Sequence, residues 1–321
     1  MYNQASQDQL KEKLDYELWL LNFLSNTEEI LGGETGISTV TLTNRQTGAN
    51  VSISLPEVLG GGAARKIINS ITPLTFTASY KIVDMIFEWI LEENYSAGRI
   101  TDRDSPARWP FLKKIDQIRN LQLEYPPLMQ SEPYIKDYLF ALYDKLLKFR
   151  HEIVHRNKFS VSSVGKLEIT TTTNGQLHIL ELDPSELDAF VKIAVAVAKL
   201  FTGNLSFGSL VDRLLKYHLD RIHKLHGLHE FNQAKPHLVN VVLKVPIEDT
   251  LFPADLKFVR QKLAQIHPNA DVLFNLEIIG LVDDKPTDRW KIPVEAVPEI
   301  DIIELPSVSF EMFRTSLPKG D

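Results

Sequence analysis

The feature that most restricts the fold is a stripe of apolar residues between positions 133 and 153. Its members are spaced four, three, four, three and four positions apart: Ile135, Leu139, Leu142, Leu146, Phe149 and Ile153. On an α-helix this spacing puts all of them on one face, which other elements must cover. Ser131 is predicted to cap the helix, and Pro133 falls in its first turn, where proline is tolerated. The chain is therefore expected to build a layer of packed helices.

Other segments carry helix and hairpin signals of their own. Further helices are predicted over residues 7–31, from 76 onward, over 112–121, from 183 to about 202 and over 205–230. Alternating apolar residues predict one hairpin over 37–55, turning at RQTGAN, and another over 166–182, turning at Asn174-Gly175. After about residue 234 the pattern changes to strand, helix, strand.

These patterns predict a mainly α fold, a helical bundle with a peripheral β-hairpin, and an additional small α+β domain after it. We expect three parts: a helix-and-hairpin extension over residues 1–69, a helical domain over 70–234, and the α+β domain over 235–321. No motif indicates a role for the last part.

Composition and charge exclude several classes of protein. The 321 residues include no cysteine, which excludes disulfides and thiolate metal sites and predicts a reducing compartment, the cytoplasm. No apolar run reaches bilayer length, and the polar, acid-bearing start is unlike a signal peptide, so no membrane is expected as a partner. A formal net charge of -7 argues against a general nucleic-acid coat protein, so a polyanion would need a local basic patch.

The stretch KFRHEIVHRNKF, residues 148–159, contains the short motif of zinc proteases. His151 and His155 are four residues apart, so a helix can stack them to share a zinc ion while Glu152 activates a water. The context is unlike a zinc site, because Lys158 and Val161 stand where extended motifs carry glycine and a third histidine. We therefore expect no metal and no cofactor, and a HExxH zinc metalloprotease is only a remote alternative.

The same stretch suits metal-free cleavage of a phosphodiester. Arginine offers a planar fork of donors to phosphate oxygens, and histidine transfers protons near neutral pH. Arg150, His151 and His155 are therefore the candidate catalytic residues. Between residues 145 and 158 five cations face one carboxylate, which predicts an electropositive patch for a phosphate. The candidate substrate-binding residues are the polar and cationic neighbours of the motif: Lys148, Arg156, Asn157 and Lys158.

The motif lies at the end of a long helix and before a hairpin and a further helix, and in this setting it resembles the HEPN superfamily (higher eukaryotes and prokaryotes nucleotide-binding). Arg150 matches the family arginine, His151 the polar position after it, and His155 the family histidine, within a likeness that covers about residues 70–203. The resemblance implies a HEPN-like bundle and a metal-independent ribonuclease whose site is assembled across a homodimer. Asn157 stands where some HEPN toxins carry a modifiable tyrosine, so that mode of control is not expected.

An ideal helix agrees with a site shared between two copies. Arg150 and His155 would point about 140° apart, so one copy would not form a tight pocket. Two copies facing each other across a twofold axis would bring both pairs into one cleft.

The expected function is an endoribonuclease that cleaves RNA by attack of the 2'-hydroxyl, in RNA restriction or toxin-like defence, with an antitoxin or regulatory protein as a further partner. The alternative is a HEPN module that binds nucleotide, RNA or a protein partner without cleaving it. The simplest structural interpretation pairs Arg150 with Glu152 or another acid and lets His155 end a helix, where a cation favours the dipole.

Four histidines follow closely in the segment YHLDRIHKLHGLHEF: His218, His223, His226 and His229. An apolar stripe in the same segment accounts for one helix face, so the histidines are expected on the solvated remainder.

Overall fold

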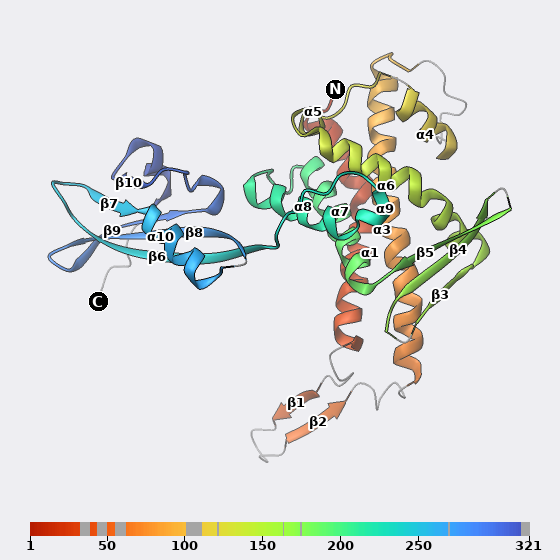
Figure 1. Cartoon of the computed structure of the whole chain (residues 1–321), viewed down its shortest axis with the longest axis horizontal. Coiled ribbons are helices and arrows are strands. Elements are labelled where there is room, and N and C mark those ends of the chain that lie inside the picture. Colours follow the sequence, from red (N-terminus) through yellow and green to blue (C-terminus); the bar gives the residue numbers. More distant parts are fainter. Residues whose placement is uncertain are drawn as a thin grey trace. The chain divides into compact units, whose positions relative to one another are not determined.

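The structure, a computed structural model, describes residues 1–32, 39–43, 50–54, 62–100, 111–120, 122–162, 164–173, 175–268 and 270–315. They form two compact units, Met1–Ser206 with Arg221–Glu230, and Phe207–Asp220 with Phe231–Asp321. The fold is of the mixed α+β class and mostly helical, with small sheets (Figure 1).

The first unit is a set of helices packed around one long central helix, α3. Its helices are α1 (Gln4–Gly32), α3 (Gly62–Ser96), α4 (Phe111–Asn120), α5 (Pro127–Ser131), α6 (Pro133–His151), α7 (Pro184–Phe201) and α9 (His223–His226). Helix α3 packs against α1, α4, α6 and α7. Its ring of Phe76 lies 5.8 Å from that of Phe190 on α7, and its Tyr80 stacks on Tyr143 of α6 at 5.5 Å. The expected helical layer is therefore present.

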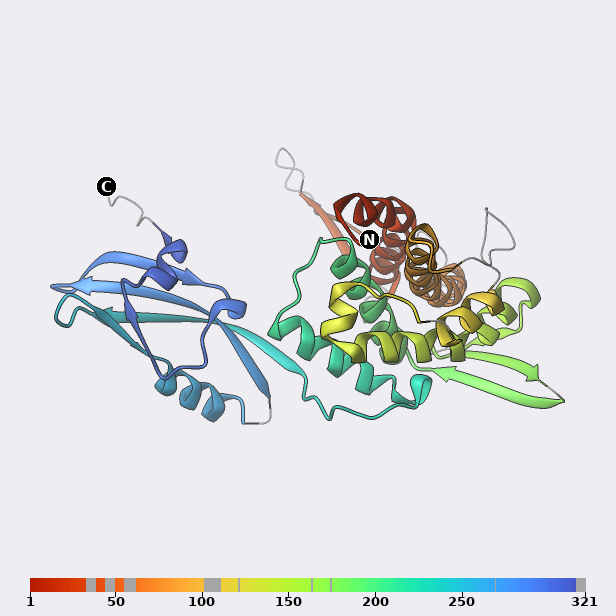
Figure 2. The ribbon, with the colours of Figure 1, turned by 90° about the horizontal axis from the view of Figure 1, so that it is seen from above.

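Two small sheets accompany these helices. Strands β1 (Thr39–Thr43) and β2 (Asn50–Ser54) pair antiparallel as the expected first hairpin, whose turn lies outside the described residues. Strands β4 (Leu167–Thr173) and β5 (Gln176–Leu182) form the expected second hairpin, in which Gly175 takes a positive φ of 77°. A third strand, β3 (Phe159–Val161), was not expected and pairs with β4. Figures 1 and 2 show this three-stranded sheet beside the C-terminal end of α6.

Helix α6 buries most of the predicted stripe, but its N-cap and the burial at its C-terminal end differ from the prediction. Ser131 does not cap it: Ser131 ends α5, and its hydroxyl donates to the Leu128 carbonyl at 3.2 Å. Glu132 is the N-cap of α6, followed by Pro133. The stripe is buried from Ile135 to Phe149, but Ile153 is only half-buried, and Glu152 takes the next buried position.

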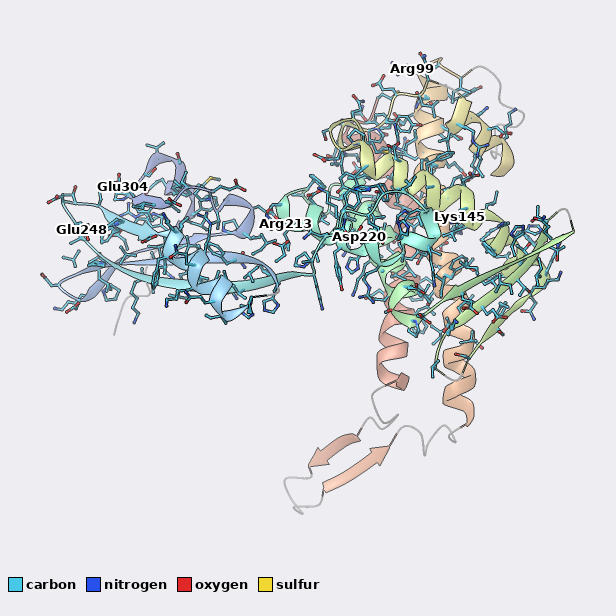
Figure 3. All side chains as sticks on the ribbon, viewed as in Figure 1. Arg99, Lys145, Arg213, Asp220, Glu248 and Glu304 are labelled. Carbon is cyan, nitrogen blue, oxygen red and sulfur yellow. The ribbon has the colours of Figure 1, made fainter. Side chains whose placement is uncertain are left out.

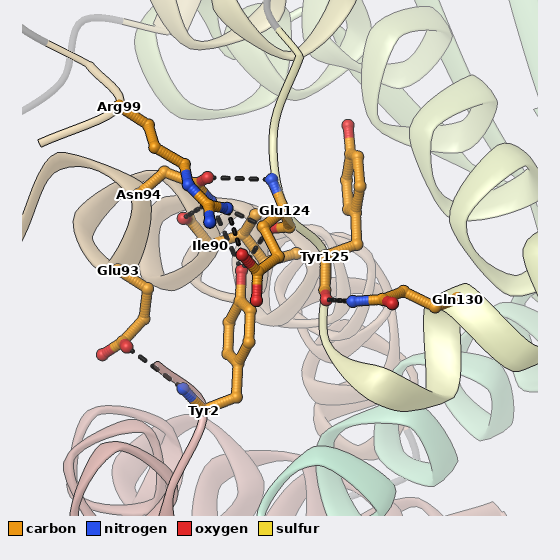
Figure 4. Close-up of polar contacts among 8 residues, drawn as sticks. All are labelled: Tyr2, Ile90, Glu93, Asn94, Arg99, Glu124, Tyr125 and Gln130. Carbon is orange, nitrogen blue, oxygen red and sulfur yellow. Dashed lines mark hydrogen bonds and ion pairs between the residues drawn. The ribbon is translucent and has the colours of Figure 1, made fainter. Parts of the chain in front are cut away.

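The start of the chain is tied to the end of α3 and the segment before α5 (Figure 4). The hydroxyl of Tyr2 donates to the Glu124 carbonyl at 2.6 Å. The Asn94 side chain donates to the same carbonyl at 2.9 Å and accepts the Glu124 N–H at 2.9 Å. Arg99 forms an ion pair with the Glu124 carboxylate. These contacts, together with the packing of α1 on α3 and α7, make residues 1–32 part of the helical unit, which differs from the expected separate extension over 1–69.

The second unit contains the expected strand, helix and strand. Strand β6 (Pro236–Pro246) runs parallel to β8 (Asp271–Val282), with α10 (Leu256–Ile266) in the connection between them. Strands β9 (Lys285–Ile292) and β11 (Arg314–Thr315) complete the sheet in the order β11-β9-β8-β6. The remaining elements are β7 (Phe252–Asp255) paired with β10 (Ile302–Leu305), and the 3-10 helices η2 (Val294–Ala296) and η3 (Val308–Phe313).

Helix α8 (Ser209–Arg221), except for its last residue, also belongs to the second unit, so the division differs from the expected boundary near residue 234. The Glu295 carboxylate accepts the Ser209 and Leu210 N–H groups at 2.6 and 3.1 Å, and Arg213 forms an ion pair with Asp271. A carboxylate at a helix N-terminus satisfies backbone donors and complements the dipole. These long-range contacts group the helix with the sheet.

Within the described ranges, no helix is long and apolar enough to cross a membrane.

Candidate functional site

A cleft of about 680 Å³ lies in the first unit, between α4, the second half of α6, the turn that follows α6, and β4. Seven of its lining side chains are basic or can become so: Arg119, Lys145, Lys148, Arg150, His151, His155 and Arg156. Its acidic lining residues are Asp116, Asp144 and Glu152. The cleft is thus a concave, mainly basic surface on a chain whose net charge is -7.

The turn after α6 is a π-helix, η1 (Glu152–Arg156). The Asn157 N–H donates to the Glu152 carbonyl, five residues back, where an α-helix would use a residue four back. The Lys158 N–H donates to the same carbonyl at 3.2 Å. Asn157 ends the turn with a left-handed φ of 52°, a conformation that asparagine tolerates better than most residues. Such π-turns are rare and recur at functional sites.

All three candidate catalytic residues line this one cleft. The imidazole rings of His151 and His155 are 4.7 Å apart, centroid to centroid, and both residues are exposed. Arg150 lines the same cleft from a half-buried position. A π-turn advances less around the helix axis per residue than an α-turn, so the 140° separation of an ideal α-helix does not apply. Arg150 and His155 therefore line one cleft of a single chain, and the homodimer stays a prediction.

A buried polar network supports the cleft from behind. The Lys114 ammonium of α4 donates to Asp84 at 2.8 Å and to Glu88 at 2.7 Å, both on α3. The Tyr143 hydroxyl donates to the same Asp84 oxygen at 2.7 Å, and the Tyr80 hydroxyl donates to the Tyr143 carbonyl at 3.2 Å. The network fixes α4, which carries one wall of the cleft, to α3 and α6.

The tyrosines of this network are held in their neutral form. Burial raises the pKa of Tyr143 well above its ordinary value, and the charge of Asp84 adds to the rise. Burial likewise raises the pKa of Tyr80, again with help from Asp84, while the nearby charge of Arg150 opposes the rise. Arg150 therefore lies close enough to Tyr80 for its charge to affect the pKa of the tyrosine.

The Glu152 side chain is buried and hydrogen-bonded, which does not suit the general base of a zinc protease. Its side chain is 3% exposed, and its Oε1 atom accepts from Arg156 at 3.0 Å and from the Thr171 hydroxyl at 2.9 Å. Arg156, rather than Arg150, is thus its ion-pair partner. In the described part of the chain, no group of three or more His, Asp or Glu side chains is arranged to hold a metal ion. The zinc interpretation gains no support from this geometry.

The candidate substrate-binding residues divide into two groups. Lys148 and Arg156 line the cleft, and the Arg156 guanidinium is half exposed although one of its nitrogens is bonded to Glu152. Asn157 and Lys158 are not among the lining residues. Asn157 ends the π-turn, and Lys158 contributes backbone, since its carbonyl accepts the Thr170 N–H at 3.4 Å.

Sequence reasoning missed Arg119, and it counted Lys145 among the five cations of residues 145–158 without naming it as a substrate-binding residue. Lys145 lies one to two turns before the motif on α6 (Figure 3). Its ammonium donates to the Lys224 carbonyl at 2.8 Å. Arg119 comes from α4 and pairs with Asp144 at 2.9 Å. Helical spacing would have placed Lys145 beside Lys148, but nothing in the local sequence connects Arg119 with a motif thirty residues later.

The histidines of residues 218–229 do not all lie on a solvated face. His226 is buried, with its ring 4.7 Å from that of Tyr138 and its Nδ1 accepting the Leu228 N–H at 3.0 Å. His226 is therefore a satisfied core histidine, and the expectation was wrong for this residue.

Comparison with protein families, with curated proteins and with solved structures finds no match to this chain.

Proposed function

We propose that this chain is a metal-independent endoribonuclease whose helical unit is a HEPN-like bundle. The observation that carries the proposal is the joint placement of Arg150, His151 and His155 in one basic cleft, with the two imidazoles 4.7 Å apart. Two neighbouring imidazoles and a guanidinium are the groups that proton transfer and phosphate binding require.

The chemistry uses the substrate's own hydroxyl as nucleophile. His155 takes the proton of the ribose 2'-hydroxyl, and the 2'-oxygen attacks the adjacent phosphorus. The bond from phosphorus to the 5'-oxygen breaks, and His151 gives this leaving oxygen a proton. Arg150 holds the non-bridging oxygens and stabilises the charge that develops on them. The products are a 2',3'-cyclic phosphate and a 5'-hydroxyl.

The surrounding basic side chains bind the rest of the strand. Lys145, Lys148 and Arg156 line the cleft on the motif side, and Arg119 lines it from α4. A chain with net charge -7 would concentrate its attraction for RNA at this patch. A homodimer, a cytoplasmic location and a part in RNA restriction or toxin-like defence, with an antitoxin or regulatory partner, belong to the same proposal and rest on the resemblance to HEPN proteins.

Analysis of the product ends tests this mechanism. A labelled RNA is incubated with the protein and an excess of a strong chelator, and the ends of the fragments are identified. We expect cleavage to persist, with a 2',3'-cyclic phosphate (or its opened form) and a 5'-hydroxyl, while RNA with a 2'-O-methyl at the cut site resists. Fragments with a 5'-phosphate and a 3'-hydroxyl, lost on chelation, would contradict the mechanism.

A HEPN-like module that binds RNA, nucleotide or a protein partner without cleaving is the second candidate. The observation in its favour is that two of the cleft's arginines are engaged by acids, Arg119 by Asp144 and Arg156 by Glu152. Under this alternative no cleavage is seen, and Arg150→Ala and His155→Ala each lower the affinity for RNA.

A further inference from the structure

Glu152 is a buried carboxylate inside the motif itself. Glutamate is almost never fully buried unless it is paired, because its charge loses hydration. Its Oε1 atom accepts from Arg156 and Thr171. Its Oε2 atom is buried and has no hydrogen-bond partner among the described residues. A buried carboxylate with one unsatisfied oxygen is costly, so the position is unexpected for a residue that serves stability alone.

The contacts of Glu152 join the π-turn to strand β4. Its side chain accepts the hydroxyl of Thr171, which is buried in β4, and the two residues are 19 positions apart. Its main-chain carbonyl accepts the N–H groups of Asn157 and Lys158. The Lys158 carbonyl in turn accepts the N–H of Thr170, the neighbour of Thr171. The Glu152 side chain and the backbone of Lys158, just after the turn, thus bond to two neighbouring residues of the strand, Thr171 and Thr170.

We propose that Glu152 and Thr171 are positioning residues, and that their hydrogen bond holds the turn in its π form and thereby keeps His155 in the cleft that Arg150 lines. The inference rests on the proposed function, because the placement matters for RNA cleavage. Without the bond, the segment would relax to a continuous α-helix, in which the Arg156 N–H donates to the Glu152 carbonyl. Ile153 would then continue the apolar stripe, and His155 would rotate relative to the cleft.

A purely stabilising role predicts something different. Loss of a buried hydroxyl would lower the free energy of unfolding but leave the turn and the imidazoles in place. A positioning role predicts a changed turn and a lower rate of cleavage with little change in RNA affinity. A displacement of about 1 Å at a reacting group can reduce a rate by about 10²-fold.

The test uses the whole protein and three variants. Thr171→Val removes the hydroxyl, whereas Thr171→Ser keeps the hydroxyl and removes only the methyl group. Thr202→Val is the matched control, because Thr202 is also buried and its hydroxyl donates to the Ala198 carbonyl at 2.9 Å, outside the cleft lining. For each protein, a crystal structure gives the bonding of residues 152–157, and kinetics with a defined RNA give kcat and Kd separately.

We expect Thr171→Val to lose the bond from Asn157 to Glu152, and to show kcat reduced by about 10²-fold with Kd within about threefold of the parent. Thr171→Ser and Thr202→Val should match the parent. A Thr171→Val protein that keeps the π-turn overturns the proposal, and so does one that loses the turn yet cleaves at the parent's rate. If the parent does not cleave RNA, the proposed function fails, and the turn in the Thr171→Val crystal structure alone decides whether the hydrogen bond sets its form.

Discussion

The imidazole rings of His151 and His155 lie 4.7 Å apart on the wall of the basic cleft. Four residues apart on a helix, they would equally suit a zinc ion, but Glu152 between them is turned inward and bonded to Arg156 and Thr171. Both imidazoles are exposed, and Arg150 lines the same cleft.

Removal of one imidazole should greatly reduce the rate of RNA cleavage but change RNA affinity little. His155→Ala is expected to reduce RNA cleavage by about 10²–10⁴-fold, because an acid–base group is lost while the basic patch stays intact. RNA affinity, measured by fluorescence anisotropy, should change little. His237→Ala is the control, because His237 is an exposed histidine of β6 in the other unit. Equal effects of the two substitutions would contradict a catalytic His155.

Mixing two inactive variants tests where the complete site lies. Arg150 and His155 line the same cleft of one chain, so neither Arg150→Ala nor His155→Ala leaves a complete site in its own chain. We expect no recovery of cleavage when the two variants are mixed under conditions that exchange subunits. Recovery to a substantial fraction of the parent rate would show instead that arginine and histidine act together across a homodimer.

The buried ammonium of Lys114 should be essential for stability. Its side chain is 3% exposed and pairs with Asp84 and Glu88, so Lys114→Met leaves two carboxylates without their cation. Breaking such a buried pair costs about 3–5 kcal/mol. Lys192→Met removes an exposed pair with Asp188 and should cost about 0–1 kcal/mol. Urea denaturation of both variants measures the difference, and similar midpoints would refute the structural role of the network.

Stability should fall in alkaline solution because of Tyr80 and Tyr143. Both pKa values are raised in the folded protein, chiefly by burial, above the ordinary value of 10.0. The unfolded chain therefore loses these protons first, and the free energy of unfolding falls as pH rises above about 10. Tyr143→Phe should reduce the loss between pH 9 and 11, measured by denaturation at each pH. An unchanged loss would show that other groups cause it.

The local pattern of the sequence determined the elements that carry the site. The apolar spacing from Ile135 to Phe149 has the period of an α-helix, and these residues are buried as expected. The Asp183 and Glu186 capping box begins α7, and the alternation around Gly175 makes the β4–β5 hairpin. Each of these features depends on residues only a few positions apart, so propensity and periodicity are sufficient to predict it.

Only the tertiary structure decided the backbone form of the motif and the cleft around it. The apolar spacing predicted that Ile153 would lie in the core. In the structure the helix ends in a π-turn, and the buried residue is Glu152, which accepts a hydrogen bond from Thr171, 19 residues away. Arg119 reaches the cleft because Lys114 anchors α4 to Asp84, 30 residues earlier. Such contacts join residues far apart in the chain, and their energy appears only when the elements pack. The sequence by itself therefore placed Arg150, His151 and His155 at a helix end, and the packing of α4 and β4 around that end made the cleft.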